Sequence, residues 1–134
     1  GSRVGIWGFN GGLGRPGTTI QRRRMGVDAG LEFGAWTIMG EVSGGKNDSN
    51  DAMHALLELN WRNPSEQCLW YGQLRTQKER NITTGWDGPL QSVIGLKWSR
   101  DRHWTLSTEW VQNLERTATG SREASIRLQI RYRF

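Results

Sequence analysis

The sequence predicts an all-β fold, an eight-stranded antiparallel up-and-down β-barrel, and three observations lead to it. Several segments alternate between apolar and polar residues, which is the period of a strand with one apolar face. The connectors between these segments alternate in length. The composition combines 18 Gly and 8 Trp with 3 Pro in 134 residues, and Gly disfavours regular helix. We expect one domain at 3–134, preceded by a Gly-Ser pair at 1–2 that we interpret as a cloning scar.

The clearest strand is 124–134, where Ala, Ile, Leu, Ile, Tyr and Phe alternate with Ser, Arg, Gln, Arg and Arg. The same period occurs in four further segments, at 24–33, 53–62, 90–99 and 104–111. Three weaker segments, at 3–10, 36–43 and 68–76, follow it less strictly. Together these segments predict eight strands.

The connectors fall into two classes that alternate along the chain. Three are short: Gly34-Ala35, 63–67 and 100–103. Four are expected to be long loops, at 11–19, 44–51, 77–88 and 115–123, because they are rich in Gly, Asn, Asp, Ser, Thr and cationic residues. Short turns at one end and long loops at the other are typical of bacterial outer-membrane barrels.

Aromatic residues gather around the short turns and predict an interfacial girdle. In such a girdle the ring lies at the edge of the hydrocarbon and its polar atom reaches water and headgroups. An alternative is that they fill the core of a soluble barrel. The predicted girdle consists of Phe33, Trp36, Trp61, Trp70, Trp98, Trp104, Tyr132 and Phe134.

The alternation allows two orientations. If the apolar set faces lipid, Leu31, Leu57, Leu96, Leu106 and Leu128 lie near mid-membrane and the charged set forms an internal network of paired charges. Gly26, Gly30 and Gly95 would then leave room for long Arg side chains, which favours this orientation. If the apolar set faces inward, the barrel is soluble and fills its own centre or holds one small ligand. The predicted lumen network comprises Arg24, Asp28, Glu32, Glu58, Arg62, Arg75, Lys97, Glu109, Arg127 and Arg131.

The last residues, Leu128-Gln129-Ile130-Arg131-Tyr132-Arg133-Phe134, resemble the carboxy-terminal β-signal of small eight-stranded outer-membrane barrels. The architecture is similar to that of the OmpA membrane domain and the Ail/Lom adhesins. The resemblance implies a transmembrane β-barrel whose last strand pairs with the first. It also implies that the barrel-assembly machinery reads Leu128, Ile130, Tyr132 and Phe134.

The net charge and the few Cys and His residues limit the functions that we expect for this chain. The net charge is +5, and basic loop residues could meet lipopolysaccharide phosphates. Cys68 is the single Cys, so no intrachain disulfide or Cys metal cluster is expected. His54 and His103 lack a Ser at a matching offset, so we expect no enzyme activity, no cofactor and no metal site. Nucleic-acid binding is not expected, because Arg residues alternate with apolar residues. The basic loop residues are Arg15, Lys46, Lys78, Arg80, Arg116 and Arg122.

The expected function is that of an integral protein of the bacterial outer membrane with a charged, plugged lumen. It would act as a structural or interaction protein through long extracellular loops. Its expected partners are outer-membrane lipid, lipopolysaccharide, the barrel-assembly machinery and an extracellular ligand. Two alternatives stay open: the terminal portion of a larger porin or polysaccharide-export barrel, or a soluble avidin-like or lipocalin-like binding barrel.

Overall fold

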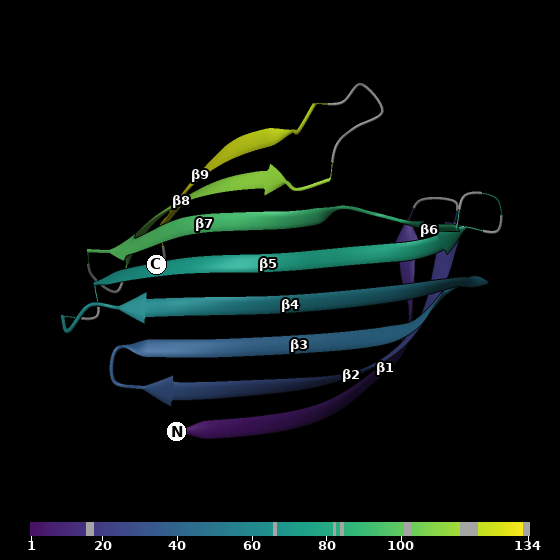
Figure 1. The fold of residues 1–134 in the computed structure, drawn as a ribbon, viewed down its shortest axis with the longest axis horizontal. Helices are drawn as coiled ribbons and strands as arrows, with labels where there is room; N and C mark the ends of the chain where they lie inside the picture. The colour runs from purple at the N-terminus through teal and green to yellow at the C-terminus, as the bar shows by residue number, and fades with distance from the viewer. Residues whose placement is uncertain are drawn as a thin grey trace.

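The computed structural model describes residues 1–15, 18–65, 67–81, 83, 85–100, 103–115 and 121–132. These residues form one antiparallel sheet in which consecutive strands pair in the order β1-β2-β3-β4-β5-β7-β8-β9, while β6 pairs with β5 (Figure 1). The all-β, up-and-down arrangement predicted from the alternation is therefore confirmed. The strands are β1 Ser2–Arg15, β2 Thr18–Phe33, β3 Trp36–Asn47, β4 Asn50–Arg62, β5 Cys68–Asn81, β6 Gly85–Asp87, β7 Leu90–Ser99, β8 Trp104–Asn113 and β9 Ala124–Tyr132.

Two of the expected long loops are instead hairpins with short connections. The predicted loop at 11–19 is wrong, because β1 ends at Arg15 and β2 begins at Thr18. The predicted loop at 44–51 is also wrong, because β3 continues to Asn47 and β4 begins at Asn50. Asp48 takes a positive φ of 52° in that turn. The Gly-rich and polar composition resembles a loop, yet the cross-strand ladder pairs its backbone groups as far as the turn.

The third predicted loop, at 77–88, is partly strand. β5 extends to Asn81, and its last residues pair with β6. In the fourth, at 115–123, the described residues lie outside the strands. The three short connections are confirmed, and Gly34 has a φ of 59°, which a glycine adopts without steric cost.

The sheet is open. β1 and β9 are its two edges, and their described residues make no contact with each other. The expected pairing of the last strand with the first is therefore absent from this structure. Figure 1 shows a curved sheet in which β1 begins and β9 ends at the same end, the end of the short turns.

The register separates the side chains into two faces because directly opposed residues point the same way. We call the outer face the one that carries Leu31, Ile38, Leu59 and Ile94, and the inner face the one that carries Glu58, Gln73 and Glu109. The buried apolar side chains among the described residues are only Ala52, Val93 and Val111, all on the inner face. The exposed large apolar side chains, except Phe9, instead lie on the outer face. Within the described residues, no helix has the length and apolar character required to cross a bilayer.

Candidate functional site: the apolar outer face and the polar inner face

The outer face carries a broad apolar belt. Between its two ends, the outer positions of β2, β3 and β4 hold only Met, Val, Ala, Leu, Ile and Gly. The outer positions of β7, β8 and β9 carry no charged residue. Leu57 and Leu128 are 53% and 69% exposed. The five leucines expected near mid-membrane all occupy outer positions: Leu31, Leu57, Leu96, Leu106 and Leu128.

An aromatic row bounds this belt at the short-turn end. Phe33 lies opposite Trp36, Trp36 opposite Trp61, and Trp61 opposite Trp70, so four strands contribute to one continuous line. Trp104 lies opposite Tyr132 in the same way, with ring centroids 4.7 Å apart. Trp98 also lies at an outer position near this end. Of the predicted girdle, only Phe134 lies outside the described residues.

A charged row bounds the belt at the opposite end. Arg23 lies opposite Lys46, and Lys46 lies opposite Asp51. The Asp51 carboxylate is 4.0 Å from Lys46 Nζ and 3.9 Å from Arg80 Nη1. On β5, Lys78 Nζ is 2.9 Å from Glu115 Oε1. Within the described strands, these are the charged residues at outer positions: Arg23, Lys46, Asp51, Lys78 and Arg80.

The charged row and the aromatic row are separated by the same number of residues on three strands. The separation is ten residues on β2, from Arg23 to Phe33. It is again ten on β3, between Trp36 and Lys46, and on β4, between Asp51 and Trp61. Ten residues of strand extend about 33 Å. At the ~45° tilt of membrane strands they rise about 23 Å, close to the ~25 Å apolar band of outer-membrane barrels.

The inner face is polar and hydrogen-bonded across strands. The Glu58 carboxylate accepts hydrogen bonds from the amides of Gln73 and Asn60. Tyr71 donates its hydroxyl proton to Glu109 over 2.6 Å. A second group joins Arg75 to Gln91 and Gln91 to Asn113. A third, near the charged row, links Arg24, Asn47, Glu79 and Asn50.

The ten residues predicted for the lumen network all occupy inner positions. They do not form ion pairs with one another. Among the described residues, no cationic nitrogen of this set lies within 4.0 Å of a carboxylate oxygen of the same set. Glu58, Glu109 and Arg75 are bonded to amides or to a tyrosine. Gln73 lies directly opposite Glu58, and Tyr71 reaches Glu109 across Gly95. Arg127 lies opposite Glu109 on the exposed edge strand β9 but forms no ion pair with it.

Glycines on the inner face receive aromatic rings, not the expected arginines. A Cβ on Gly26 would lie 2.6 Å from the Trp7 ring, and a Cβ on Gly95 would lie 2.2 Å from the Tyr71 ring. Of the three glycines expected to leave room for arginines, Gly30 is the one whose Cβ would meet an arginine side chain, that of Arg3. Sequence reasoning missed both rings, since each belongs to a segment with a weaker alternation. An aromatic residue opposite a glycine on a neighbouring strand is the signal that could have found them.

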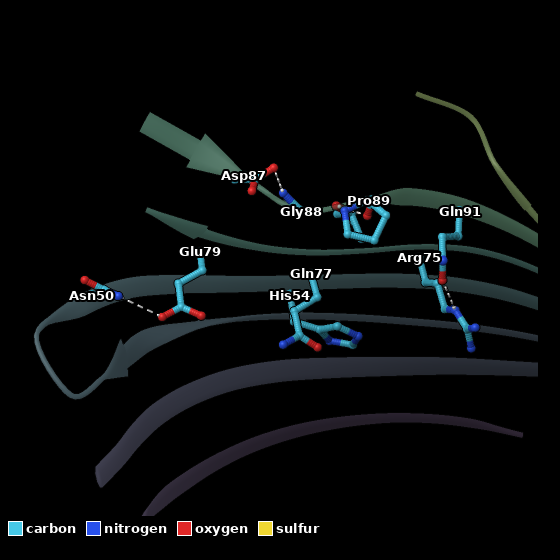
Figure 2. Close-up of a pocket in the computed structure, with 10 residues that line it drawn as sticks. Asn50, His54, Arg75, Gln77, Glu79, Asp87, Gly88, Pro89 and Gln91 are labelled. Atoms are coloured by element: carbon cyan, nitrogen blue, oxygen red, sulfur yellow. Dashed lines mark hydrogen bonds between the residues drawn. The ribbon is translucent and has the colours of Figure 1, made fainter. Parts of the chain in front are cut away.

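Several hollows open on the inner face, and two of them lie beside the hydrogen-bonded groups described above. The larger, of about 690 Å³, lies toward the charged row, between β4, β5 and the segment from Asp87 to Gln91 (Figure 2). Figure 2 shows Glu79 directed at Asn50, and His54 and Gln77 between them and Arg75. His54 Nδ1 lies 3.5 Å from Glu41 Oε1. The smaller hollow, about 290 Å³, lies beside Tyr71 and Glu109.

The remaining predicted residues are placed as follows. Leu128, Ile130 and Tyr132 of the expected assembly signal point outward on the exposed edge strand β9. No group of three His, Cys, Asp or Glu in the part of the chain that the structure describes is placed to hold a metal ion. No known family model matches this chain, and no curated protein matches it significantly.

Proposed function

We propose that the chain is an integral β-barrel protein of the bacterial outer membrane, with the outer face in lipid and the inner face in a polar interior. The observation that carries this proposal is the charge-free belt between two rows that stay in register. Soluble monomers rarely expose contiguous apolar patches of this extent. A soluble binding barrel would instead need its apolar set on the face that here carries Glu58, Gln73 and Glu109.

The backbone groups at the two edges of the sheet must also be hydrogen-bonded if the sheet lies in a membrane. Hydrocarbon contains no water to satisfy unpaired N–H and C=O groups, so a sheet in lipid has no open edge. In a membrane, therefore, the edges at β1 and β9 must pair, either with each other or with further strands. Pairing with each other would give the small barrel whose interior the inner-face side chains fill.

The role we propose is structural and interactive, and the hairpins beyond the charged row would carry the contacts outside the membrane. The β1–β2 hairpin extends past Arg23 to its turn, and the β5–β6 segment also lies at this end. Lipopolysaccharide, the barrel-assembly machinery and an extracellular ligand remain the proposed partners. Chemistry at a catalytic centre is not part of the proposal.

The open edges favour a second candidate, in which this chain is part of the wall of a wider porin-like or export barrel. Edges that do not meet, together with an inner hollow of about 690 Å³, are compatible with more strands around an aqueous path. Because the path from β1 to β9 holds an even number of strands, whole hairpins added at either edge keep the number even, so that the outermost strands of a wider barrel can close antiparallel.

Insertion into lipid tests the proposal. We expect the unfolded chain to fold into phosphatidylcholine vesicles, resist protease there and change gel mobility on heating in detergent. A monodisperse, folded protein in detergent-free buffer would contradict the membrane assignment.

Crosslinking separates the two candidates. In a Cys68→Ser background, Ile6→Cys is combined in turn with Ile126→Cys, Leu128→Cys or Ile130→Cys, which occupy outer positions on the two edge strands. A disulfide within one chain after insertion supports the closed eight-stranded barrel. Disulfides only between chains, in all three pairs, support the wider barrel.

A further inference from the structure

The charged row on the outer face is unbalanced in sign. In the described strands it contains four cations, Arg23, Lys46, Lys78 and Arg80, and one carboxylate, Asp51, while Glu115, outside the strands, pairs with Lys78. Asp51 is shared between Lys46 and Arg80 at 4.0 and 3.9 Å. Arg23 has no carboxylate partner in the described part of the chain. The side chains of Lys46 and Arg80 are 62% and 61% exposed, so the row presents accessible positive charge.

A hollow lies beside two of these cations, and most of its lining residues occupy outer positions, namely Gly8, Asn10, Arg23, Met25, Gly44 and Lys46. Its volume is about 620 Å³. Arg23 and Lys46 line it at the charged end, and Met25 lies toward the apolar belt. Gly8 and Gly44 stand opposite Met25 on either side, so the strands β1 and β3 contribute no side chain there. The result is a surface depression with an apolar floor and a cationic rim.

The strand register holds this rim in place. Gly45 approaches β2 so closely that a Cβ would lie 1.9 Å from the carbonyl oxygen of Arg23. In this register Arg23 lies directly opposite Lys46, so the two side chains are neighbours on the outer face. Two cations on adjacent strands, at the edge of an apolar belt, match the position of a phosphate at the boundary between headgroup and acyl chain.

We propose that this depression is a binding site for a membrane lipid with a phosphorylated headgroup. Arg23 and Lys46 bind the phosphate, and one acyl chain lies over Gly8, Gly44 and Met25. The inference rests on the proposed membrane insertion and adds the chemistry of the lipid at one place on the wall. It also orients the protein, because the charged row then faces the leaflet that supplies that lipid.

The test measures lipid retention by native mass spectrometry of the full chain, folded and then exchanged into neutral detergent. The probe is a diphosphorylated glucosamine lipid, titrated against phosphatidylcholine. We expect the combined variant Arg23→Gln/Lys46→Gln to weaken binding on the order of tenfold or more, and added salt to weaken wild-type binding. The matched control is Arg22→Gln, since Arg22 is adjacent on β2 but points to the inner face.

A second pair of variants tests the hollow. Gly44→Leu fills it, and a Cβ at Gly44 meets only ordinary contact, 3.9 Å from the Ala52 carbonyl oxygen. Gly40→Leu is the control, because Gly40 has the same 3.9 Å clearance but lies further along the belt. We expect Gly44→Leu to weaken lipid binding severalfold and Gly40→Leu to leave it unchanged. Inorganic phosphate at millimolar concentration should not displace the lipid.

The outcomes are distinguishable. If the wild-type chain inserts into phosphatidylcholine vesicles but the phosphorylated lipid binds the Arg23→Gln/Lys46→Gln variant as tightly as wild type, the lipid site is wrong and the membrane proposal stands. An equal loss of lipid binding in the control Arg22→Gln also overturns the proposed lipid site. Complete displacement by inorganic phosphate rejects the lipid as the source of the phosphate. Failure of the wild-type chain to insert overturns both proposals.

Discussion

Tyr71 connects the two halves of the inner face. Its ring lies against Gly95 on β7, and its hydroxyl reaches past that strand to Glu109 on β8. Glu58 sits nearby on β4, bonded to Gln73 and Asn60. A tyrosine can make this link only because Gly95 has no side chain. The inner face is thus ordered by amides and one phenol, not by the arginine–carboxylate pairs expected from the sequence.

Removing the phenol hydroxyl should therefore destabilise the sheet. For Tyr71→Phe we predict a loss of roughly 1–3 kcal/mol, because Glu109 keeps its position but loses its hydrogen-bond donor. The measurement is the free energy of unfolding by urea in vesicles. Thr108→Val, on the outer position next to Glu109, serves as a control for changing one hydroxyl on β8. An unchanged stability for Tyr71→Phe would show that this bond contributes nothing.

Leu128 tests the lipid-facing assignment at a single position. It is 69% exposed on the outer face of β9, so Leu128→Arg places a charge in hydrocarbon and should cost roughly 2–4 kcal/mol. Gln129→Arg is the matched control, because Gln129 points inward beside the smaller hollow. We expect Leu128→Arg to block folding into vesicles and Gln129→Arg to allow it. Normal folding of both would refute the assignment of the faces.

At the scale of the residue, the sequence alone predicts which side chains share a face. Period two places Leu57 and Glu58 on opposite sides whatever the register. It does not predict partners, since these depend on which residues of the next strand lie opposite. Tyr71, Gln73 and Gln91 enter the network through that register, and neither charge nor motif distinguishes them in the sequence.

At the scale of the element, the hairpins at the far end show where composition misleads. Gly44, Gly45, Lys46 and Asn47 resemble a loop, yet they are strand residues paired with both β2 and β4. Gly45 is required because the β2 backbone approaches it, not because a turn needs it. The strands 90–99 and 104–111, which lack such Gly-rich extensions, were predicted almost to their ends.

This difference between neighbouring glycines is testable. A Cβ at Gly45 would overlap the backbone of Arg23 and Arg24, at 1.9 and 2.8 Å, whereas a Cβ at Gly44 has room. We predict that Gly45→Ala destabilises the β2–β3 ladder by about 1–3 kcal/mol, as steric overpacking does, and that Gly44→Ala changes stability little. Amide hydrogen exchange along β2 measures the stability of this ladder in the two variants. Equal protection in both variants would contradict the register.

At the scale of the whole molecule, the boundary rows become visible only after folding. The aromatic residues could be grouped from the sequence because each pair flanks a short turn. Lys46 and Arg80 could be grouped as basic residues of expected loops, but their alignment with Arg23 in one row could not be predicted. These residues are far apart in the chain and meet only through the pairing of β2, β3, β4 and β5. Closure of the sheet into a barrel cannot be predicted from local alternation either, because it depends on whether the distant strands β1 and β9 pair.

The most direct test of the lipid-facing arrangement compares two adjacent residues. Leu56 points to the inner face and Leu57 to the outer face of β4. In a Cys68→Ser background, Leu56→Cys and Leu57→Cys are spin-labelled, and the folded proteins in vesicles are exposed to oxygen and to a water-soluble nickel chelate. We predict that oxygen relaxes the label at position 57 more strongly and that the chelate does so at position 56. The reverse pattern, or equal access of the chelate to both labels, would contradict the account.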